Sequence, residues 1–383
     1  MNRVPIQPRL LDWAIARAGI SPEDIRIRFT KYDAWIEGSL YPTLKQLQNF
    51  ARVTHTAIGC FFLNEPPELP IPIPDFRTVK TRNLEKPSPD LLDTIYLCQQ
   101  RQDWYIRYAR SVGAEALSYI GTATTNSNIE HVAAIIRSML QMDVTQTKTC
   151  HSWEDALRHI IQLAEEIGVL VMVSGVVGSN NTRKLNPKEF RGFALSHAVA
   201  PLIFINGSDT KSAQMFTLAH ELAHLWLGQS ALSDATAATS ATSTVERWCD
   251  RVAAEVLVPL EAFRAEYNTS SAVVNEMQRL ARVFKVSTLV VLRRMNDVRG
   301  FDRSWFWPVY QAEEQRLMGI VANRSGGGDY YNTTTARISR RFTRAIVTST
   351  LEGRSTFTEA FRLVGCRRMS TFAELGNRVG VTL

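Results

Sequence analysis

Two histidines and a glutamate stand close together in the stretch HELAH, residues 220–224. An α-helix repeats about every 3.6 residues, so positions four apart lie on one face, and His220 and His224 can bind one divalent metal ion. Glu221 lies between them and can act as a general base on a water molecule at that metal. Apolar residues around the trio predict a helix that stops near Gly228. The stretch therefore predicts part of a hydrolytic metal site.

A hydrolytic metal site needs a third protein ligand and an open position for water. Glu246 and Asp250 lie one turn apart in residues 245–259, whose apolar spacing predicts a helix closed by a proline. Glu246 can complete the metal site, and Asp250 can accept the second ring N–H of a ligating histidine. Glu255 lies about half a turn away around this helix, and we expect it to be structural. Cys249 is the nearest rival ligand, but it lies off that face and is more typical of a small buried hydrophobe.

The HExxH pattern occurs in zinc peptidases, and a second helix with ExxxD is the arrangement of the gluzincin group. Around these motifs the chain resembles the ImmA/IrrE-type metallopeptidases, strongly over about residues 150–300. The blocks that carry the likeness are FRGFAL (190–195), PLIFIN (201–206), FTLA (216–219) and CDRVAAEVLVP (249–259). One departure is that the family often has Asn where this chain has Asp250.

The resemblance implies a zinc-dependent endopeptidase that cleaves a helix-turn-helix transcriptional repressor or an antitoxin-type regulator. In that reading His220, His224 and Glu246 hold Zn²⁺, one ion per chain, Glu221 is the catalytic residue, and Asp250 orients a ligand. The residues themselves leave the metal open, because two nitrogens and one oxygen also suit other divalent ions.

The predicted fold is α+β and mostly helical, with a zincin-like core made of a small sheet beside the HExxH helix. Blocks rich in β-branched and aromatic residues near Val169–Val173, Phe193 and Ile203 predict the strands. We expect one strand to be free to pair with an extended substrate, and the Ser/Thr/Ala-rich residues 230–244 to form a loop near the site.

The predicted segments are an Xre-like helix-turn-helix (1–65), a Pro-rich linker (66–87), a helical region with the metallopeptidase core (88–268), and a helix-turn-helix-like, basic C-terminal region (269–383).

The first segment has the helix order of an Xre-type helix-turn-helix, with Ser21 as an N-cap before Pro22. The part between Arg28 and Trp35, where the recognition helix belongs, is short and poor in side chains that read bases. A degenerate module used for docking is therefore an alternative to DNA binding.

Positive charge is concentrated in the last third of the chain. Residues 271–383 hold 18 Lys and Arg against 9 Asp and Glu, whereas the rest holds 26 against 28, for a total of +7. Helical spacing places Arg337, Arg340, Arg341 and Arg344 on one face, which can meet a phosphate backbone or an acidic protein. A solvated helix face is the alternative that we favour. Arg293 and Arg294, in the helix-turn-helix-like part, are further candidates for phosphate contacts.

Composition favours a reducing compartment. The five cysteines are odd in number and form no CxxC pair, so neither a disulfide framework nor a cysteine metal site is indicated. The N-terminal residues lack an apolar signal region, and the longest apolar run, 167–178, is too short to cross a bilayer. We expect a soluble, cytoplasmic protein with no membrane partner.

Two functional hypotheses follow. The first is the metal-dependent endopeptidase, whose partner is a protein substrate such as a helix-turn-helix regulator or a toxin-antitoxin component. The second is a DNA-binding regulator or antitoxin-like binding protein that uses the metallopeptidase fold as a sensor or docking surface. The presence of Glu221 beside an open metal site favours the first, because a purely binding role needs no general base.

Overall fold

The structure, a computed structural model, describes residues 3–75, 87–143, 150–233, 243–322 and 330–382. Residues 76–86 of the linker predicted at 66–87 and the centre of the loop predicted at 230–244 lie outside these residues. The chain divides into two compact units, one formed by Met1–Pro72 and Leu84–Asp93, the other by Ile73–Asn83 and Thr94–Leu383.

The first unit is a small helical bundle. Trp35, Phe50 and Phe61 are fully buried at its centre. Ser21 caps the second helix by accepting the N–H of Asp24, as the sequence predicts. The position expected for a recognition helix holds only the five residues of α3. The elements are α1 (Pro8–Ala18), α2 (Pro22–Arg28), α3 (Tyr32–Ile36), α4 (Leu44–Val53) and the 3₁₀ helix η1 (Ile58–Phe62).

The second unit is built around a four-stranded mixed sheet in the order β1-β3-β2-β4. β1 runs parallel to β3, whereas β2 is antiparallel to both β3 and β4. Every residue of β2, β3 and β4 is buried. The strands are β1 (Leu170–Ser174), β2 (Gly192–Leu195), β3 (Leu202–Asn206) and β4 (Ala231–Ser233).

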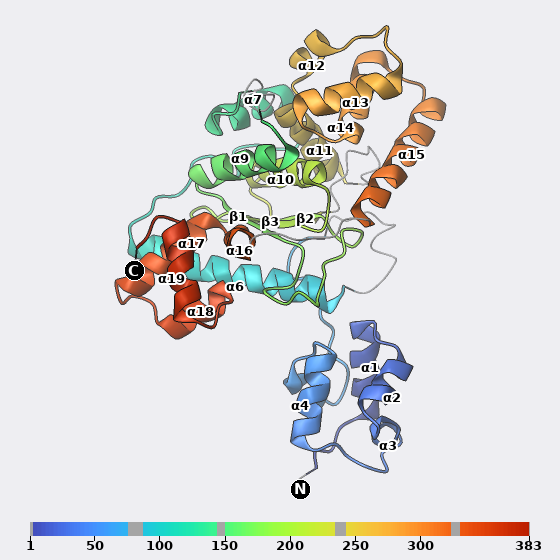
Figure 1. The fold of residues 1–383 in the computed structure, drawn as a ribbon, viewed down its shortest axis with the longest axis vertical. Coiled ribbons are helices and arrows are strands. Elements are labelled where there is room, and N and C mark those ends of the chain that lie inside the picture. Colours follow the sequence, from blue (N-terminus) through green and yellow to red (C-terminus); the bar gives the residue numbers. More distant parts are fainter. Residues whose placement is uncertain (1–2, 76–86, 144–149, 234–242, 323–329, 383) are drawn as a thin grey trace. The chain divides into compact units, whose positions relative to one another are not determined.

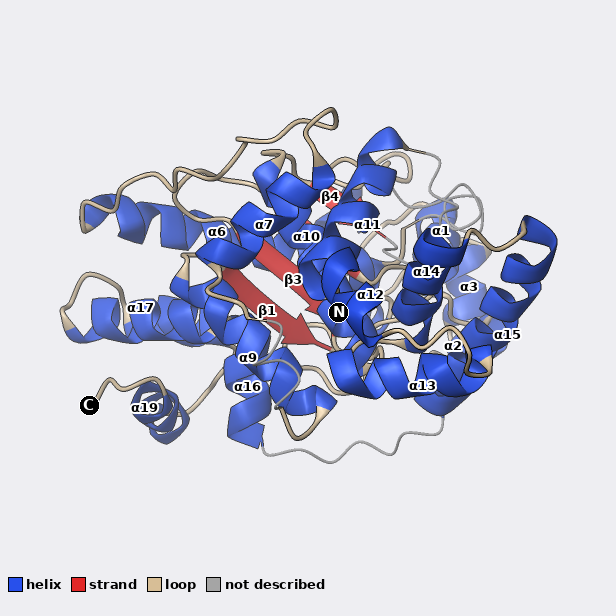
Figure 2. Ribbon diagram, turned by 90° about the horizontal axis from the view of Figure 1, so that it is seen from above, coloured by secondary structure: helices blue, strands red, loops and turns tan. Residues whose placement is uncertain are grey.

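Helices cover both faces of this sheet. Figure 1 shows α9 (Trp153–Glu166) and α10 (Lys211–Trp226) on one face and α6 (Pro89–Ser111) on the other. Figure 2 views the sheet from the side that α9 and α10 cover. Apolar side chains of α9, of α10 and of one face of the strands belong to the main core. Because α6 covers the other face, the strands are buried on both faces and occur as short, continuous apolar blocks. The predicted α+β, mostly helical fold is confirmed.

The outer edge of β4 is paired with the chain itself. The N–H of Leu232 donates to the carbonyl of Pro74 at 2.9 Å, and Asp75 forms a parallel bridge with Leu232. The expectation of a free strand is therefore wrong for β4 at this position. A proline can occupy such an edge because only its carbonyl is needed.

Further helices extend the side of the sheet that α10 covers. α10 packs against α11, and α11 packs against α7. Within the described residues, no helix is both long and apolar enough to cross a membrane. The helices are α7 (Ile129–Met139), α11 (Thr244–Leu257), α12 (Leu260–Glu266), α13 (Val273–Phe284), α14 (Thr288–Arg299) and α15 (Arg303–Ala322).

The two arginines of α14 are buried. Arg293 and Arg294 are each 5% exposed. Arg294 donates to the carbonyl of Val258 at 2.9 Å and pairs with Glu255 at 2.6 Å. The expectation that Arg293 and Arg294 contact phosphate is wrong, because a guanidinium enclosed in this way cannot reach a nucleic acid. Glu255 has the structural role expected for it.

The C-terminal helices pack beside β1 and α6. They are α16 (Tyr330–Ile338), α17 (Arg340–Leu351), α18 (Phe357–Val364) and α19 (Met369–Arg378). Ser339 separates α16 from α17 with a φ of 69° and caps α17 by accepting the N–H of Phe342. Its hydroxyl also donates to the buried carboxylate of Glu165, which accepts the N–H of Arg341 at 3.5 Å as well. Burial raises the pKa of Glu165.

The four arginines of this region do not line one helix face. Arg337 lies on α16, and the break at Ser339 places the other three on α17. Arg341 binds the hydroxyl of Tyr105 and the carbonyl of Glu165. The predicted stripe is therefore wrong. The helical repeat is interrupted at Ser339, which has a positive φ and whose hydroxyl donates to the distant carboxylate of Glu165.

Arg340 and Arg344 bind the last carbonyls of α19, those of Arg378 at 2.8 Å and Val379 at 2.9 Å. Because cations there satisfy orphan carbonyls, we expect Arg340→Gln/Arg344→Gln to lower the free energy of unfolding by about 1 kcal/mol. Arg362→Gln removes an exposed arginine that makes no hydrogen bond or ion pair in the described chain, and it should leave stability unchanged. Denaturant titration measures both free energies of unfolding.

Because Arg340 and Arg344 bind carbonyls of their own chain, wild-type protein should not retard duplex DNA in a gel. Retardation that the double variant loses would contradict the structural role of these two arginines.

Candidate metal centre

Helix α10 brings the HELAH residues into the core. Thr210 caps it by accepting the N–H of Ala213, and the helix runs for 16 residues. From Gln214 to Trp226 every residue is buried. The helix is thus enclosed on all sides, and a polar side chain on it must find a partner or a ligand.

Helix α11 supplies the two carboxylates. Glu246 lies in its first turn and Asp250 one turn later, and both are buried although charged. Ala253, Ala254 and Leu257 continue the buried surface of the helix toward its C-terminal end. The packing of α11 on α10 brings both carboxylates to His220.

Three side chains converge on one point. The Nε2 atom of His220 lies 3.1 Å from Oε2 of Glu246, and Nε2 of His224 lies 3.0 Å from Oε1 of the same carboxylate. The two Nε2 atoms are 3.1 Å apart. One ligand atom from each residue can be chosen so that all lie within 4.8 Å of one another. The structure therefore brings together the three residues that the sequence predicts as metal ligands.

The donor set fits a zinc ion. Zn–N and Zn–O bonds of about 2.0–2.2 Å in a tetrahedron separate the ligand atoms by about 3.3 Å, so a small expansion of the observed spacing admits the metal. Two ring nitrogens that face each other at 3.1 Å cannot both present lone pairs without a cation or a proton between them. Two nitrogens and one carboxylate also leave a fourth position, as catalytic zinc sites do.

The carboxylates of this cluster favour positive charge at His220. Burial acts to lower the pKa of His220, but Glu246 and Asp250 outweigh it and raise this pKa well above its usual value. Burial likewise acts to raise the pKa of Glu246, yet the two histidines bring it down to about 2. The site therefore favours a positive charge between its ligands, and a divalent ion would displace that proton.

Asp250 holds one ligand in place. Its Oδ1 lies 2.9 Å from Nδ1 of His220, so a proton on Nδ1 leaves Nε2 turned toward Glu246. Burial raises the pKa of Asp250, while His220 and the charge of Arg293 act against that rise. This arrangement is the carboxylate–histidine contact that orients ligands in metal sites, as the sequence predicts for Asp250.

Glu221 lies beside the ligands with its carboxylate buried. Within the described residues neither of its oxygens makes a hydrogen bond, and the same is true of the hydroxyl of Ser233 on β4. Burial raises the pKa of Glu221 to about 8, with His220 acting to lower it and Glu246 to raise it. A carboxylate without a partner, held next to three ligands, is suited to take and return a proton.

Sequence reasoning missed the residues of β2 and β4 that enclose Glu221. A Cβ atom on Gly192 would lie 2.5 Å from Cγ2 of Thr217, 2.8 Å from the carbonyl oxygen of Phe204 and 3.3 Å from Oε1 of Glu221. The absence of a side chain at Gly192 therefore lets α10 approach the sheet. The FRGFAL block contains this signal, but nothing local identifies which helix needs the space.

Two regions of the chain match known family models. Residues 164–296 match the IrrE N-terminal-like domain of the M78 peptidases, and residues 338–378 match a domain of unknown function, DUF8813. No curated protein matches the chain. The first match contains all five site residues and supports both the resemblance to the ImmA/IrrE family and a metallopeptidase-like function in general.

Proposed function

We propose that this chain is a zinc-dependent endopeptidase of narrow specificity that cleaves a helix-turn-helix repressor or an antitoxin-type regulator. The observation that carries the proposal is the buried cluster of His220, His224 and Glu246 with the unpartnered carboxylate of Glu221 beside it. The match to a peptidase family model over 164–296 supports it.

The chain's own residues have distinct tasks in this reaction. His220, His224 and Glu246 would hold the metal, which when bound polarises the scissile carbonyl and makes water more acidic. Asp250 fixes the ring of His220 through Nδ1. Glu221 accepts the proton that the attacking water loses and passes it to the leaving amide nitrogen, so that the broken C–N bond yields an acid and an amine.

The burial of the site supports narrow specificity. His220, Glu221 and His224 are each 0% exposed, and the edge of β4 is already bridged to Asp75. A peptide therefore reaches the site only after local rearrangement, and binding energy from a specific partner can drive such a step. The helical bundle formed by α1–α4 is a candidate surface for that recognition. The resemblance to the ImmA/IrrE family supports a helix-turn-helix protein as the partner.

A co-expression experiment tests the proposal. We expect wild-type protein, produced together with a helix-turn-helix regulator encoded beside it, to yield a discrete truncated product of that regulator, while casein stays intact. Glu221→Gln preserves the size of the side chain but removes its basicity, and it should abolish the product. A product that persists in this variant would show that another protease cuts the regulator. No cleavage of any neighbouring regulator would contradict the assigned substrate class.

A further inference from the structure

Strand β4 directs a hydroxyl group toward the carboxylate of Glu221. Ser233, the last residue of β4, lies directly opposite Gly192 on β2 in the antiparallel register. Side chains of directly opposite residues point to the same face of a sheet. A Cβ atom on Gly192 would lie 2.5 Å from Cγ2 of Thr217 and 3.3 Å from Oε1 of Glu221, so this face is the one toward α10. The side chain of Ser233 therefore points to the side on which Glu221 lies.

The backbone around Ser233 is held on both sides of β4. The carbonyl oxygen of Ser233 accepts the N–H of Arg191 at 3.3 Å. On the outer edge of the strand, the preceding residue, Leu232, donates its N–H to the carbonyl oxygen of Pro74 at 2.9 Å. The position of Ser233 in the sheet is thus fixed, and only the rotation of its side chain remains to direct the hydroxyl.

Both polar groups are buried without a hydrogen bond among the described residues. Ser233 and Glu221 are each 0% exposed, and neither the hydroxyl of Ser233 nor either carboxylate oxygen of Glu221 has a hydrogen-bond partner. A buried donor or acceptor that lacks a partner costs free energy. Burial raises the pKa of Glu221 to about 8, and the nearby hydroxyl of Ser233 acts in the opposite direction. Each of the two groups is therefore the partner that the other lacks.

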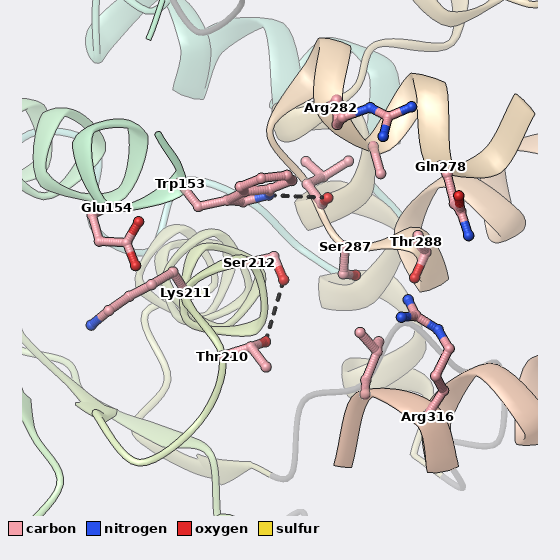
Figure 3. A pocket seen from close by; sticks show the side chains of 13 residues that line it. Trp153, Glu154, Thr210, Lys211, Ser212, Gln278, Arg282, Ser287, Thr288 and Arg316 are labelled. Carbon is pink, nitrogen blue, oxygen red and sulfur yellow. Dashed lines mark hydrogen bonds between the residues drawn. The ribbon is translucent and has the colours of Figure 1, made fainter. Parts of the chain in front are cut away.

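The polar groups around a cavity elsewhere in the second unit show the contrast. This cavity, of about 400 Å³, is lined by the starts of α9, α10 and α14. Figure 3 shows that Trp153 donates to the carbonyl of Val286 and that the hydroxyls of Thr210 and Ser212 are hydrogen-bonded to each other. These groups are already paired and require no further partner, whereas Ser233 requires one.

Hydrolysis requires a carboxylate with a fixed orientation. A general base must present one oxygen within hydrogen-bond distance of the proton that it removes. The last torsion of a glutamate side chain is broad, so a carboxylate without a donor turns about that bond. A hydroxyl that donates to one oxygen limits this rotation and leaves the other oxygen to the water.

We propose that Ser233 is a positioning residue for Glu221. Its hydroxyl donates to one oxygen of the Glu221 carboxylate, and the other oxygen accepts the proton that the attacking water loses. Ser233 acts through Glu221 and binds neither the metal nor the substrate. This role rests on the proposed peptidase function, whereas the contact between the two side chains does not.

Cleavage kinetics of the full-length, metal-loaded protein test the role. Ser233→Ala should lower kcat and kcat/KM about tenfold each and leave KM unchanged, because the lost hydrogen bond supports the reaction and not substrate binding. Ser233→Thr keeps the hydroxyl and should retain more activity than Ser233→Ala. Elemental analysis should give the same metal content in wild type and both variants, since Ser233 is not a ligand.

Ser174→Ala is the matched control. Ser174 ends β1, at the opposite edge of the sheet, and its buried hydroxyl donates to the carbonyl of Val176 at 2.6 Å. The substitution removes the same group from the same kind of position, but away from Glu221. It should lower stability and leave kcat per folded molecule unchanged.

A double-mutant cycle tests the contact without any cleavage. Denaturant titration at saturating Zn²⁺ compares the full-length wild type, Ser233→Ala, Glu221→Leu and the double variant. If the hydroxyl contacts the carboxylate, the change in unfolding free energy caused by Ser233→Ala should differ between the wild-type and the Glu221→Leu backgrounds. Equal changes in both backgrounds would overturn the proposal.

The two experiments distinguish failure of this role from failure of the proposed function. Wild-type kcat in Ser233→Ala, in a protein whose cleavage is lost in Glu221→Gln, would overturn the positioning role alone. A raised KM with unchanged kcat would also overturn it, because Ser233 would then bind substrate. A wild-type protein that cleaves no regulator would contradict the proposed function, and coupling in the cycle would then still support the contact of Ser233 with Glu221.

Discussion

Purified wild-type protein is expected to contain about one divalent metal ion per chain, and His220→Ala and Glu246→Ala are expected to lose it. Each substitution removes one of three ligands whose donor atoms lie 3.0–3.1 Å apart. Loss of one ligand also leaves the remaining charged groups buried without compensation. Elemental analysis after dialysis measures the metal content, and titration with Zn²⁺ measures its affinity. Equal metal content in wild type and both variants would refute the ligand assignment.

Two further variants, Glu221→Gln and Asp250→Ala, are expected to change metal binding less than the loss of a ligand does. Glu221→Gln should retain the metal, because Glu221 is not a ligand, but it should slow peptide cleavage about 10²–10⁴-fold. Asp250→Ala should keep the three ligands and lose only the contact to Nδ1 of His220, which lowers metal affinity about 10–100-fold. If Glu221→Gln lost the metal as completely as His220→Ala does, Glu221 would have to be counted as a ligand.

The second large effect is expected from Gly192→Ala. The added methyl group would lie 2.5 Å from Cγ2 of Thr217 and 2.8 Å from a backbone oxygen of β3, so α10 must move away from the sheet. Overpacking of this kind costs about 1–3 kcal/mol of the free energy of unfolding. Because Oε1 of Glu221 lies 3.3 Å from the same position, cleavage should fall further than the loss of folded protein explains. Denaturant titration and cleavage rates at equal folded concentration measure the two effects.

A control and a rescue accompany this substitution. Gly319 on α15 has open space where an added methyl group would lie, so Gly319→Ala should be neutral or stabilise by up to about 1 kcal/mol. Thr217→Ser removes the methyl group that collides first, and combined with Gly192→Ala it should recover part of the lost stability. Equal stability of Gly192→Ala and wild type would show that the approach of α10 to β2 is looser than described.

The grouping of His220, His224 and Glu246 could be predicted from the sequence because the pattern that indicates it is local. His220 and His224 lie four residues apart on one helix, and so do Glu246 and Asp250 on the next, so helical periodicity alone orients each pair. Helical periodicity does not show that α10 packs on α11, and the structure adds this contact. The strands were predictable for a similar reason, since continuous apolar blocks such as 202–206 indicate burial on both faces.

The arginines show what local patterns cannot reveal. Arg294 is buried because Glu255, 39 residues earlier in the chain, neutralises it, and no periodicity encodes that pairing. The predicted arginine stripe failed at Ser339, which is neither glycine nor proline. Its break depends on Glu165, a residue 174 positions away. The sequence shows where the arginines are, but it does not show which residue each arginine pairs with. Their exposure to solvent could therefore not be predicted.

The contact of Glu165 with Ser339 and Arg341 crosses the two matched family regions, 164–296 and 338–378. A change of Glu165 to an apolar residue would leave the hydroxyl of Ser339 and the N–H of Arg341 without this acceptor. A change of Ser339 would remove one hydrogen-bond donor from the buried carboxylate of Glu165. We therefore expect positions 165 and 339 to vary together, because the contact joins their side chains, whereas Arg341 contributes a backbone N–H that other residues also supply. Among homologous sequences, those that contain the 338–378 region should keep an acidic residue at position 165, and those that lack the region should be free to lose it.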